Sequence, residues 1–570
     1  MARRPENLLY AVEDKPPFIR LVLLGIQNTI LIAIYLVYIV IITKAAGSTQ
    51  QTTVSAISMG MIAVAIATVL QSLSKGPIGS GYFSPPVYSA IYLGPSVLAA
   101  KAGGLPAVFG MTIFAGLVEL LLSGFLHKLR PYFPPAVSGF IILIVGIQLG
   151  LVGLDQVLDI ANYDDPKFIY HVVISVLSLS TIIALSVWAK GLARLLCSLI
   201  GILVGFVISI PLGLISSESV SLFTSLSFID LPNFGYISYS FDYALIPAFL
   251  TAGLAAALRT IGVITTSQKI NDDDWKKPDI VSIKKGVLAD GIGCILGGVM
   301  GTPGMNSSPS IIGVAKATGA TSRYIALPTA IILIALAFFP KISSFFLMLP
   351  LSVIGAALLV NAAFMISGGM EIITSRNIDS RMSYIIGIPL LLGISRKVYP
   401  HYYEEIPKAL QLISNSVLSL GVIAIILLNI LFRIGIKQRK VFVFDESDSD
   451  LTTLKEYLHS RSSQWQLDPD VIQRATNSTK QVIEHIREAK LHNSNIGIKV
   501  SYDQLDLQID ISYEGVLLSL PNISVKAESY VEEEAFAHGL ADFLTGVYPD
   551  RYQVSSKKNS SKISLFFNVM

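Results

Sequence analysis

The sequence predicts an all-α polytopic membrane protein with about fourteen spans, followed by a C-terminal soluble α/β domain. Three observations predict this organisation. Residues 20–436 form one apolar run after another, and many runs of about 20 residues carry almost no charge, which suits a bilayer crossing. Residues 437–570 have the mixed composition of soluble protein. Charged residues make up only 14% of the 570 residues, against about 25% in typical soluble domains.

The chain divides into a charged N-terminus at 1–19, a membrane domain at 20–436 and a soluble domain at 437–570. The N-terminus lacks the early apolar core and the small-residue cleavage site of a signal peptide. Apolar windows predict spans near 20–43, 53–73, 81–100, 104–126, 134–153, 169–188, 193–215, 243–268, 286–302, 304–319, 323–340, 344–366, 383–396 and 409–433.

The distribution of Lys and Arg predicts the orientation of these spans. Every second loop carries a group of basic residues, such as 269–285, whereas the loop at 155–166 on the opposite side is acidic. Basic loops remain in the cytoplasm during membrane insertion. We therefore expect a multi-pass protein of the plasma (inner) membrane with both termini in the cytoplasm.

The third predicted span of each half is interrupted. Residues 79–86 read Gly-Ser-Gly-Tyr-Phe-Ser-Pro-Pro, and residues 301–309 read Gly-Thr-Pro-Gly-Met-Asn-Ser-Ser-Pro. Pro cannot continue a helix, and non-helical backbone at bilayer depth persists only where protein or a watery cavity satisfies it. Matched interruptions in two halves indicate the binding site of a transporter. The alternative is that both segments are ordinary kinks.

A helix that begins inside the membrane has unpaired N–H groups and a partial positive charge at its first turn. Two such beginnings that face each other would form a polar or anion-binding site. The interrupted segments therefore predict a site for a small polar solute.

Several motifs point to one family when they are read in order. They are Leu-Gly-Ile-Gln-Asn at 24–28, Ile-Gly-Ser-Gly-Tyr-Phe at 78–83, Phe-Pro-Pro-Ala-Val-Ser-Gly at 133–139, Ala-Asp-Gly-Ile-Gly at 289–293, Ile-Gly-Val-Ala-Lys-Ala-Thr-Gly at 312–319, and Ser-Gly-Gly at 367–369. Together they resemble the nucleobase/ascorbate transporter family, also called xanthine/uracil permeases. The resemblance covers most of residues 18–435.

This resemblance implies two inverted repeats of seven spans, arranged as a core domain and a gate domain. It also implies a short extended segment before a half-helix in spans 3 and 10. Members of the family carry a nucleobase together with a proton or a sodium ion, and they often form homodimers. The partners expected here are a small-molecule substrate, a coupling proton or sodium ion, membrane lipid and a second copy of the chain.

The sequence departs from the family at three polar positions. Ser310 and Ile311 stand where the family signature has Gln or Glu followed by Asn. Arg259 stands where span 8 of the family carries a Glu, and Asn28 replaces a His. The change from an acid to Arg259 reverses the local charge and favours an anionic substrate.

Arg259 admits three interpretations, because an Arg deep in a span is costly unless it faces a cavity or a partner. It could bind an anion between the half-helices, extend to the cytoplasmic headgroups, or pair with Asp290. The predicted substrate-binding set is Arg259, Phe83, Ser84, Ser307, Ser308, Ser310, Gln27 and Asn28.

The soluble domain is predicted to have α/β order. Helices are expected at 450–460, 468–491 and 532–545, and strands of a mixed sheet at 497–501, 505–511, 515–520, 552–555 and 561–567. The order distantly resembles the ATP-binding fold of histidine kinases in a degenerate form. Glu488 stands where that fold has an Asn ligand for magnesium, so we expect no ATP binding. The domain would serve stability or dimerisation, or regulation.

Three functional hypotheses follow. The first is a secondary transporter, by resemblance a nucleobase permease. The second is a small-anion transporter that uses Arg259, and the third is a solute sensor that does not transport and signals through the soluble domain. The seven His residues form no metal pattern and no P-loop is present, so we expect no enzyme, no cofactor and no metal. The net charge of +3 gives no indication of nucleic-acid binding.

Overall fold

The structure is a computed structural model that separates into two compact units, Met1–Leu428 and Asn429–Met570, which are described individually. The described residues are 5–6, 8–129, 134–158, 167–275, 278–375, 378, 380–432, 438–443, 451–465, 467, 469–488, 496–502, 506–514, 549, 551–557 and 560–568. The predicted strand at 515–520 and helix at 532–545 lie outside them, as do parts of 133–139 and 155–166.

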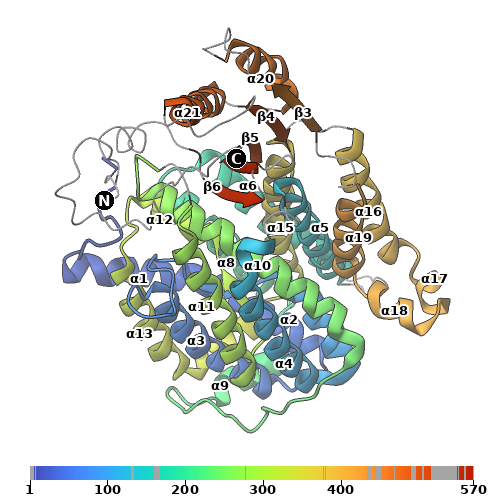
Figure 1. Ribbon diagram of the computed structural model, residues 1–570. Helices are drawn as coiled ribbons and strands as arrows, with labels where there is room; N and C mark the ends of the chain where they lie inside the picture. The colour runs from blue at the N-terminus through green and yellow to red at the C-terminus, as the bar shows by residue number, and fades with distance from the viewer. Residues whose placement is uncertain are drawn as a thin grey trace. The chain divides into compact units, whose positions relative to one another are not determined.

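The first unit is mainly helical (Figure 1). Among its described residues there are also two strands of three residues each, β1 Pro86–Tyr88 and β2 Met305–Ser307. Its helices are α1 Phe18–Ala33, η1 Ile34–Leu36, α2 Val37–Ala45, α3 Gln50–Ser72, α4 Ala90–Leu129, α5 Pro135–Leu158, α6 Phe168–Trp188, α7 Leu192–Leu195, α8 Cys197–Ser209, α9 Ser217–Ser225, η4 Tyr243–Leu245, α10 Ile246–Ile270, α11 Ile280–Val299, α12 Pro309–Thr318, η5 Arg323–Ile325, α13 Ala326–Ala337, α14 Pro340–Met348, α15 Leu351–Thr374, α16 Ser380–Val398, α17 Pro400–Glu405, α18 Lys408–Ser414 and α19 Val417–Phe432.

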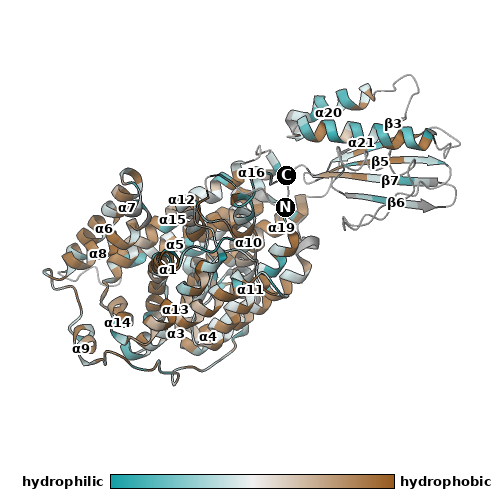
Figure 2. Cartoon of the chain, turned by 90° about the vertical axis from the view of Figure 1, so that its left-hand side faces the viewer, coloured by the Kyte–Doolittle hydropathy of each residue, from teal (hydrophilic) through white to brown (hydrophobic). Residues whose placement is uncertain are grey.

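The helices of the first unit are apolar along most of their length (Figure 2). Among the described residues, seven helices are long and apolar enough to cross a membrane, and a bent pair makes an eighth. With the sequence comparisons given below, this makes the first unit a multi-pass membrane domain.

Helix α4 contains two helices joined at a sharp break. Gly103 and Gly104 have non-helical backbone angles, and Gly104 has φ of 69°, a conformation that favours glycine. The break lies between the spans predicted at 81–100 and 104–126. The first part of α4 is therefore a short helix that begins at Ala90, inside the domain.

One pair of predicted spans is misplaced. The predicted span at 323–340 ends early, because α13 stops at Ala337 and α14 leaves it at an angle of 82°. The predicted span at 344–366 is wrong at both ends, since α15 begins only after Pro350 and runs to Thr374. Pro350 has no amide hydrogen to donate to α14, and its fixed φ suits the position just before a helix.

Glycines allow α5 and α15 to pack closely. A Cβ atom added to Gly139 would lie 2.8 Å from the carbonyl oxygen of Gly369, and one added to Gly153 would lie 3.1 Å from that of Gly355. Helix α4 meets α11 in a similar way, with Gly116 facing Gly291. Helix α3 packs against both α11 and α13 (Figure 1).

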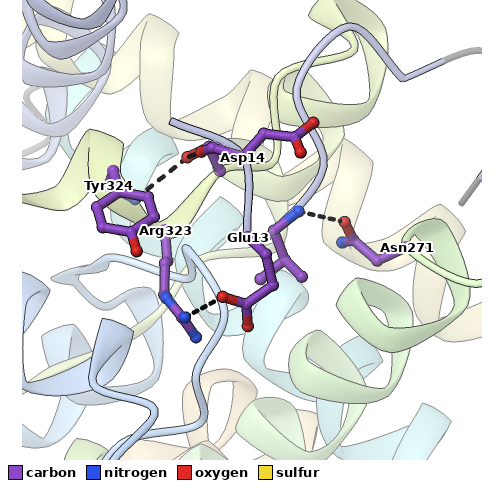
Figure 3. Close-up of polar contacts among 7 residues, drawn as sticks. Glu13, Asp14, Asn271, Arg323 and Tyr324 are labelled. Atoms are coloured by element: carbon purple, nitrogen blue, oxygen red, sulfur yellow. Dashed lines mark hydrogen bonds and ion pairs between the residues drawn. The ribbon is translucent and has the colours of Figure 1, made fainter. Parts of the chain in front are cut away.

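The N-terminal strap, residues 10–15, lies along the loop that follows α12. The amide of Tyr10 donates to the carbonyl of Gly319 at 2.9 Å, and the amide of Thr321 donates to the carbonyl of Tyr10 at 2.8 Å. The amide of Val12 donates to Oδ1 of Asn271, at the end of α10, at 3.1 Å (Figure 3). The strap therefore joins the end of α10 to the end of α12.

The second unit holds a five-stranded sheet of order β3-β4-β5-β7-β6. Its elements are β3 Gln438–Val443, α20 Thr452–Trp465, α21 Pro469–Glu488, β4 Gly497–Tyr502, β5 Asp506–Glu514, β6 Arg551–Lys557 and β7 Ser560–Asn568. All described neighbouring strands are antiparallel, so the prediction of a mixed sheet was wrong for this part of the chain. Strand β3 was not predicted. Helix α21 packs on β5 and β7 through a shared apolar core (Figure 2).

Candidate functional site

The two interrupted segments meet in a short antiparallel ribbon. Strand β1, Pro86–Tyr88, pairs with β2, Met305–Ser307, and Val87 lies opposite Asn306. All six residues are buried. Each strand leads directly into a helix that begins inside the domain, α4 at Ala90 and α12 at Pro309. The ribbon therefore brings two helix N-termini close to each other, from segments that are more than 200 residues apart in sequence.

Local sequence explains both helix beginnings. Ser89 precedes α4, and its Oγ accepts from the amide of Ile91 at 3.3 Å, as a helix cap does. Pro309 is the first residue of α12, where its missing amide hydrogen costs nothing. Gly319 ends α12 in the left-handed conformation with φ of 66°.

Asp290 of α11 anchors the ribbon. Its carboxylate accepts from Nδ2 of Asn306 at 2.9 Å, from the amide of Ser307 at 3.1 Å and from Oγ of Ser307 at 3.0 Å. Oγ1 of Thr260 on α10 also donates to it. Asp290 therefore accepts from nearby backbone and side chains, and among the described residues it does not form the ion pair with Arg259 that was one of the three interpretations of that residue.

Arg259 of α10 is directed at the beginning of α4. Its Nη1 donates to Oγ of Ser89 at 3.2 Å. Within the described part of the chain, no carboxylate oxygen lies within 4.0 Å of its guanidinium nitrogens. A cationic group thus lies at the positively polarised end of a helix, and among the described residues no carboxylate is in contact with it.

The predicted serines take different positions around the ribbon. Oγ of Ser84 lies 3.3 Å from Oγ of Ser267, and Oγ of Ser307 accepts from Nε2 of Gln71 at 2.9 Å. Ser308 is fully buried at the N-cap position of α12, yet its Oγ has no hydrogen-bond partner among the described residues. Ser310 is exposed, one residue into α12.

The remaining predicted residues are less closely tied to the ribbon. Phe83 is buried just before β1. Gln27 and Asn28 lie on α1, and Nδ2 of Asn28 donates to the carbonyl of Leu24 in its own helix at 2.8 Å. Neither residue hydrogen-bonds to the ribbon, α10 or α12 within the described residues.

The site also contains residues that the sequence analysis missed. Oη of Tyr35, in the short 3₁₀ turn η1, donates to Oγ of Ser310 at 3.2 Å. The rings of Tyr35 and Tyr38 pack edge to face, 5.9 Å apart, and both lie near Arg259. Neither Tyr gave a signal in sequence, because each lies in a long apolar run.

A buried acid behind the ribbon was also missed. Glu119 of α4 is fully buried, and Oη of Tyr92 donates to its Oε1. Its Oε2 has no partner among the described residues. The Tyr92 ring packs on Gly304, just before β2, so this pair supports the ribbon from behind. No group of three potential metal ligands occurs among the described residues.

Comparisons with known proteins show the family of the chain. Residues 19–402 match the model of the Permease family of xanthine/uracil permeases. The chain is 27% identical to Xanthine permease XanP of Escherichia coli K12 over 445 residues, which cover 75% of this chain and 95% of XanP. It is 26% identical to the Xanthine permease of Bacillus subtilis over 438 residues, which cover 76% of this chain and 97% of that protein.

A solved structure shares the fold. It is murine Solute Carrier 26 family member A9, which aligns with a TM-score of 0.52 at 12% sequence identity and covers 77% of this chain and 72% of that chain. The family model and the sequence relatives confirm the family that the sequence motifs predicted. The chain is a membrane protein that belongs to the xanthine/uracil Permease family, also called the nucleobase/ascorbate transporter family.

Proposed function

We propose that this protein is a secondary transporter that carries a xanthine- or uracil-like nucleobase across the membrane. The observation that carries the proposal is the buried ribbon β1–β2, from which α4 and α12 both begin inside the domain. Discontinuous helices whose N-termini meet near mid-membrane are how secondary transporters build substrate sites. Relatives that align over 75% and 76% of this chain are named xanthine permeases, which supports a purine as the substrate.

The substrate would lie between the ribbon and α10. Three groups there can hydrogen-bond a heterocycle: the unpartnered Oγ of Ser308, the first amides of α12, and the guanidinium of Arg259. Ser84 and Ser307 hold the ribbon in place, Phe83 supplies apolar surface, and Ser310 lies at the edge beside Tyr35.

We also propose fourteen spans in two inverted repeats of seven, with a core domain and a gate domain. Equivalent elements of the two halves meet in pairs, β1 with β2 and α5 with α15, and this supports the repeat. Both termini would face the cytoplasm of a plasma (inner) membrane, in keeping with the basic loops. Coupling to a proton or a sodium ion and assembly as a homodimer remain expectations from the family.

Uptake into proteoliposomes tests the transport proposal. We expect saturable uptake of labelled xanthine or uracil by the full chain, and loss of uptake when the imposed proton and sodium gradients are both removed. Ser308→Ala should weaken uptake about tenfold, since a hydrogen bond to a buried ligand is worth about 1 kcal/mol or more. Ser367→Ala is the control, because that exposed hydroxyl bonds only to the carbonyl of Phe364 in its own helix.

The outcome separates the competing functions. Binding of a nucleobase without any uptake would favour a sensor that signals through the soluble unit. A small-anion carrier is the second candidate, and the lone guanidinium of Arg259 beside Ser89 favours it. Uptake of bicarbonate or sulfate in place of every nucleobase would therefore replace the proposed function.

A further inference from the structure

We infer that the site selects the anionic form of a planar heterocycle, such as a deprotonated oxopurine, and that Arg259 determines this selectivity. The inference rests on the proposed function and names the charge state of its substrate. Three independent features of the site carry it: the placement of like charges, the unused hydrogen-bonding capacity, and the aromatic side chains beside the guanidinium.

The first feature is a conflict of charge that an anion would resolve. The guanidinium of Arg259 donates to Oγ of Ser89, and the same oxygen accepts from the amide of Ile91 in the first turn of α4. A cation at a helix N-terminus meets the partial positive charge of that end, which is unfavourable. Inside a membrane domain the cost is larger, because little water screens the charges. A ligand with negative charge between them removes this cost.

The local carboxylate does not serve as that anion. Asp290 is the one acidic group that interacts electrostatically with Arg259 among the described residues. Its oxygens already accept from Thr260, Asn306 and Ser307, and the structure shows no ion pair between this carboxylate and Arg259. The carboxylate of Asp290 is therefore occupied by hydrogen bonds to the ribbon and its surroundings. N–H groups of the Arg259 guanidinium are then available to a ligand.

The second feature is hydrogen-bonding capacity without a partner. A guanidinium has five N–H donors, and within the described residues Arg259 makes one hydrogen bond. Oγ of Ser308, at the start of the other half-helix, is fully buried and also without a partner there. Buried polar groups are nearly always hydrogen-bonded, so their free donors indicate a ligand with acceptor atoms. A deprotonated oxopurine presents such acceptors at adjacent ring nitrogen and carbonyl positions.

The third feature distinguishes a heterocycle from an inorganic anion. Tyr35 and Tyr38 pack edge to face beside Arg259, and Tyr35 reaches Ser310 on α12. Tyr38 is buried, whereas Tyr35 is partly exposed and offers a ring that a flat heterocycle can stack on or meet edge-on. A bicarbonate or sulfate ion would gain nothing from these two rings.

The test measures binding by the full-length protein in nanodiscs, with urate, which is a monoanion at neutral pH, and hypoxanthine, which is neutral. We expect urate to bind roughly ten- to hundredfold more tightly, as charge-assisted hydrogen bonds allow. Arg259→Gln should weaken urate binding by a similar factor and change hypoxanthine binding less than about threefold. Arg381→Gln, on the exposed surface of α16, should change neither.

A second measurement needs no variant, so it stands even if Arg259→Gln fails to fold. Xanthine binding to the unmodified protein should tighten as pH rises through the ionisation of xanthine itself. Equal affinity for urate and hypoxanthine would overturn the inference. Xanthine binding that does not change with pH would also overturn it. Neither result would contradict the proposed function as a nucleobase transporter. If neither purine nor pyrimidine binds and sulfate or bicarbonate does, the proposed function itself has failed.

Discussion

Oδ1 of Asp290 accepts from both the amide and the hydroxyl of Ser307, at 3.1 and 3.0 Å. One carboxylate oxygen on α11 therefore fixes the last residue of β2. Ser307 is followed by Ser308 and the start of α12, so this contact also sets where the half-helix begins. The position of the proposed site thus depends on a residue that does not need to touch the ligand.

Removal of the Asp290 carboxylate should destabilise the ribbon. Asp290→Ala leaves Oγ1 of Thr260 and the amide of Ser307 without their acceptor, and each such loss in a buried place costs about 1–3 kcal/mol. We expect a fall in the thermal unfolding midpoint of the detergent-purified protein and loss of nucleobase binding. Asp155→Asn is the control.

Asp155 forms an exposed ion pair with Lys397 at 2.8 Å, and such pairs contribute about 0–1 kcal/mol. Its replacement should leave the midpoint and the binding nearly unchanged. If Asp290→Ala and Asp155→Asn shifted the midpoint equally, the anchoring role of Asp290 would be refuted.

Gly304 should not tolerate a side chain. A Cβ atom there would lie 2.4 Å from Cγ of Tyr92, closer than real Cβ contacts, and the Tyr92 ring is fully buried. We expect Gly304→Ala to cost about 1–3 kcal/mol by overpacking and to reduce uptake strongly. Uptake and the unfolding midpoint are the readouts.

Gly313→Ala is the matched control in α12. No atom lies within 4 Å of its added Cβ, and alanine in a helix interior gains roughly 0.5–1 kcal/mol over glycine. This variant should keep its uptake and be equally or more stable. A Gly304→Ala protein as active as Gly313→Ala would contradict the packing of Tyr92 against the ribbon.

The N-terminal strap depends on Asn271. Oδ1 of Asn271 accepts from the amide of Val12 (Figure 3). The same oxygen accepts from Oγ1 of Thr321 at 2.7 Å, and Nδ2 of Asn271 donates to the carbonyl of Ser267. Asn271→Ala should release residues 10–15 and make them more sensitive to limited proteolysis, since the buried bonds are lost.

Glu13→Gln provides the comparison for the strap. Glu13 pairs with Arg323, but its side chain is 66% exposed, so the pair contributes little. Cleavage at the strap should increase several-fold in Asn271→Ala and stay near the original rate in Glu13→Gln. Equal protection in both variants would mean that backbone pairing with 319–323 suffices to hold the strap.

The interruptions that form the ribbon could be expected from sequence because their determinants are local, whereas the pairing of the two segments was not predicted. Pro and Gly in 79–86 and 301–309 exclude a continuous helix whatever surrounds them. Arg259 and Asp290 stood out for the same reason, since a charge within an apolar run is costly in any context. These predictions used single residues and their immediate neighbours.

The missed features depend on contacts between distant segments. Tyr35 reaches Ser310 only after α1, η1 and α12 have packed, and an aromatic residue in an apolar run looks like ordinary core. Strand β3 carries Arg439 and Lys440 among apolar residues, and it pairs with β4 some 60 residues later in the chain. The misplaced spans at 323–366 share one cause, because hydropathy does not distinguish a sharp bend between short apolar helices from a longer helix.

The stability of the soluble unit should fall in acid because of Asp510. Burial raises the pKa of this carboxyl, but hydrogen bonds from Ser564 and Gln508 and the ion pair with Lys562 outweigh burial and hold the pKa below its usual value of 3.8. A lowered pKa in the folded state means that the stabilisation is fully present above about pH 4 and is lost as pH falls through the folded value.

Trp465, which stacks on Tyr502 at 4.8 Å, reports unfolding of this unit by fluorescence once Trp188 and Trp275 are replaced by Phe. Asp510→Asn should lose about 1 kcal/mol at neutral pH and show a weaker dependence on pH below 4, because the amide does not titrate. Ser512→Ala, two residues along β5 with a partly exposed hydroxyl bond to the carbonyl of Gly497, should keep the original acid dependence. An acid transition that is identical in Asp510→Asn and in the unmodified protein would show that other groups control it.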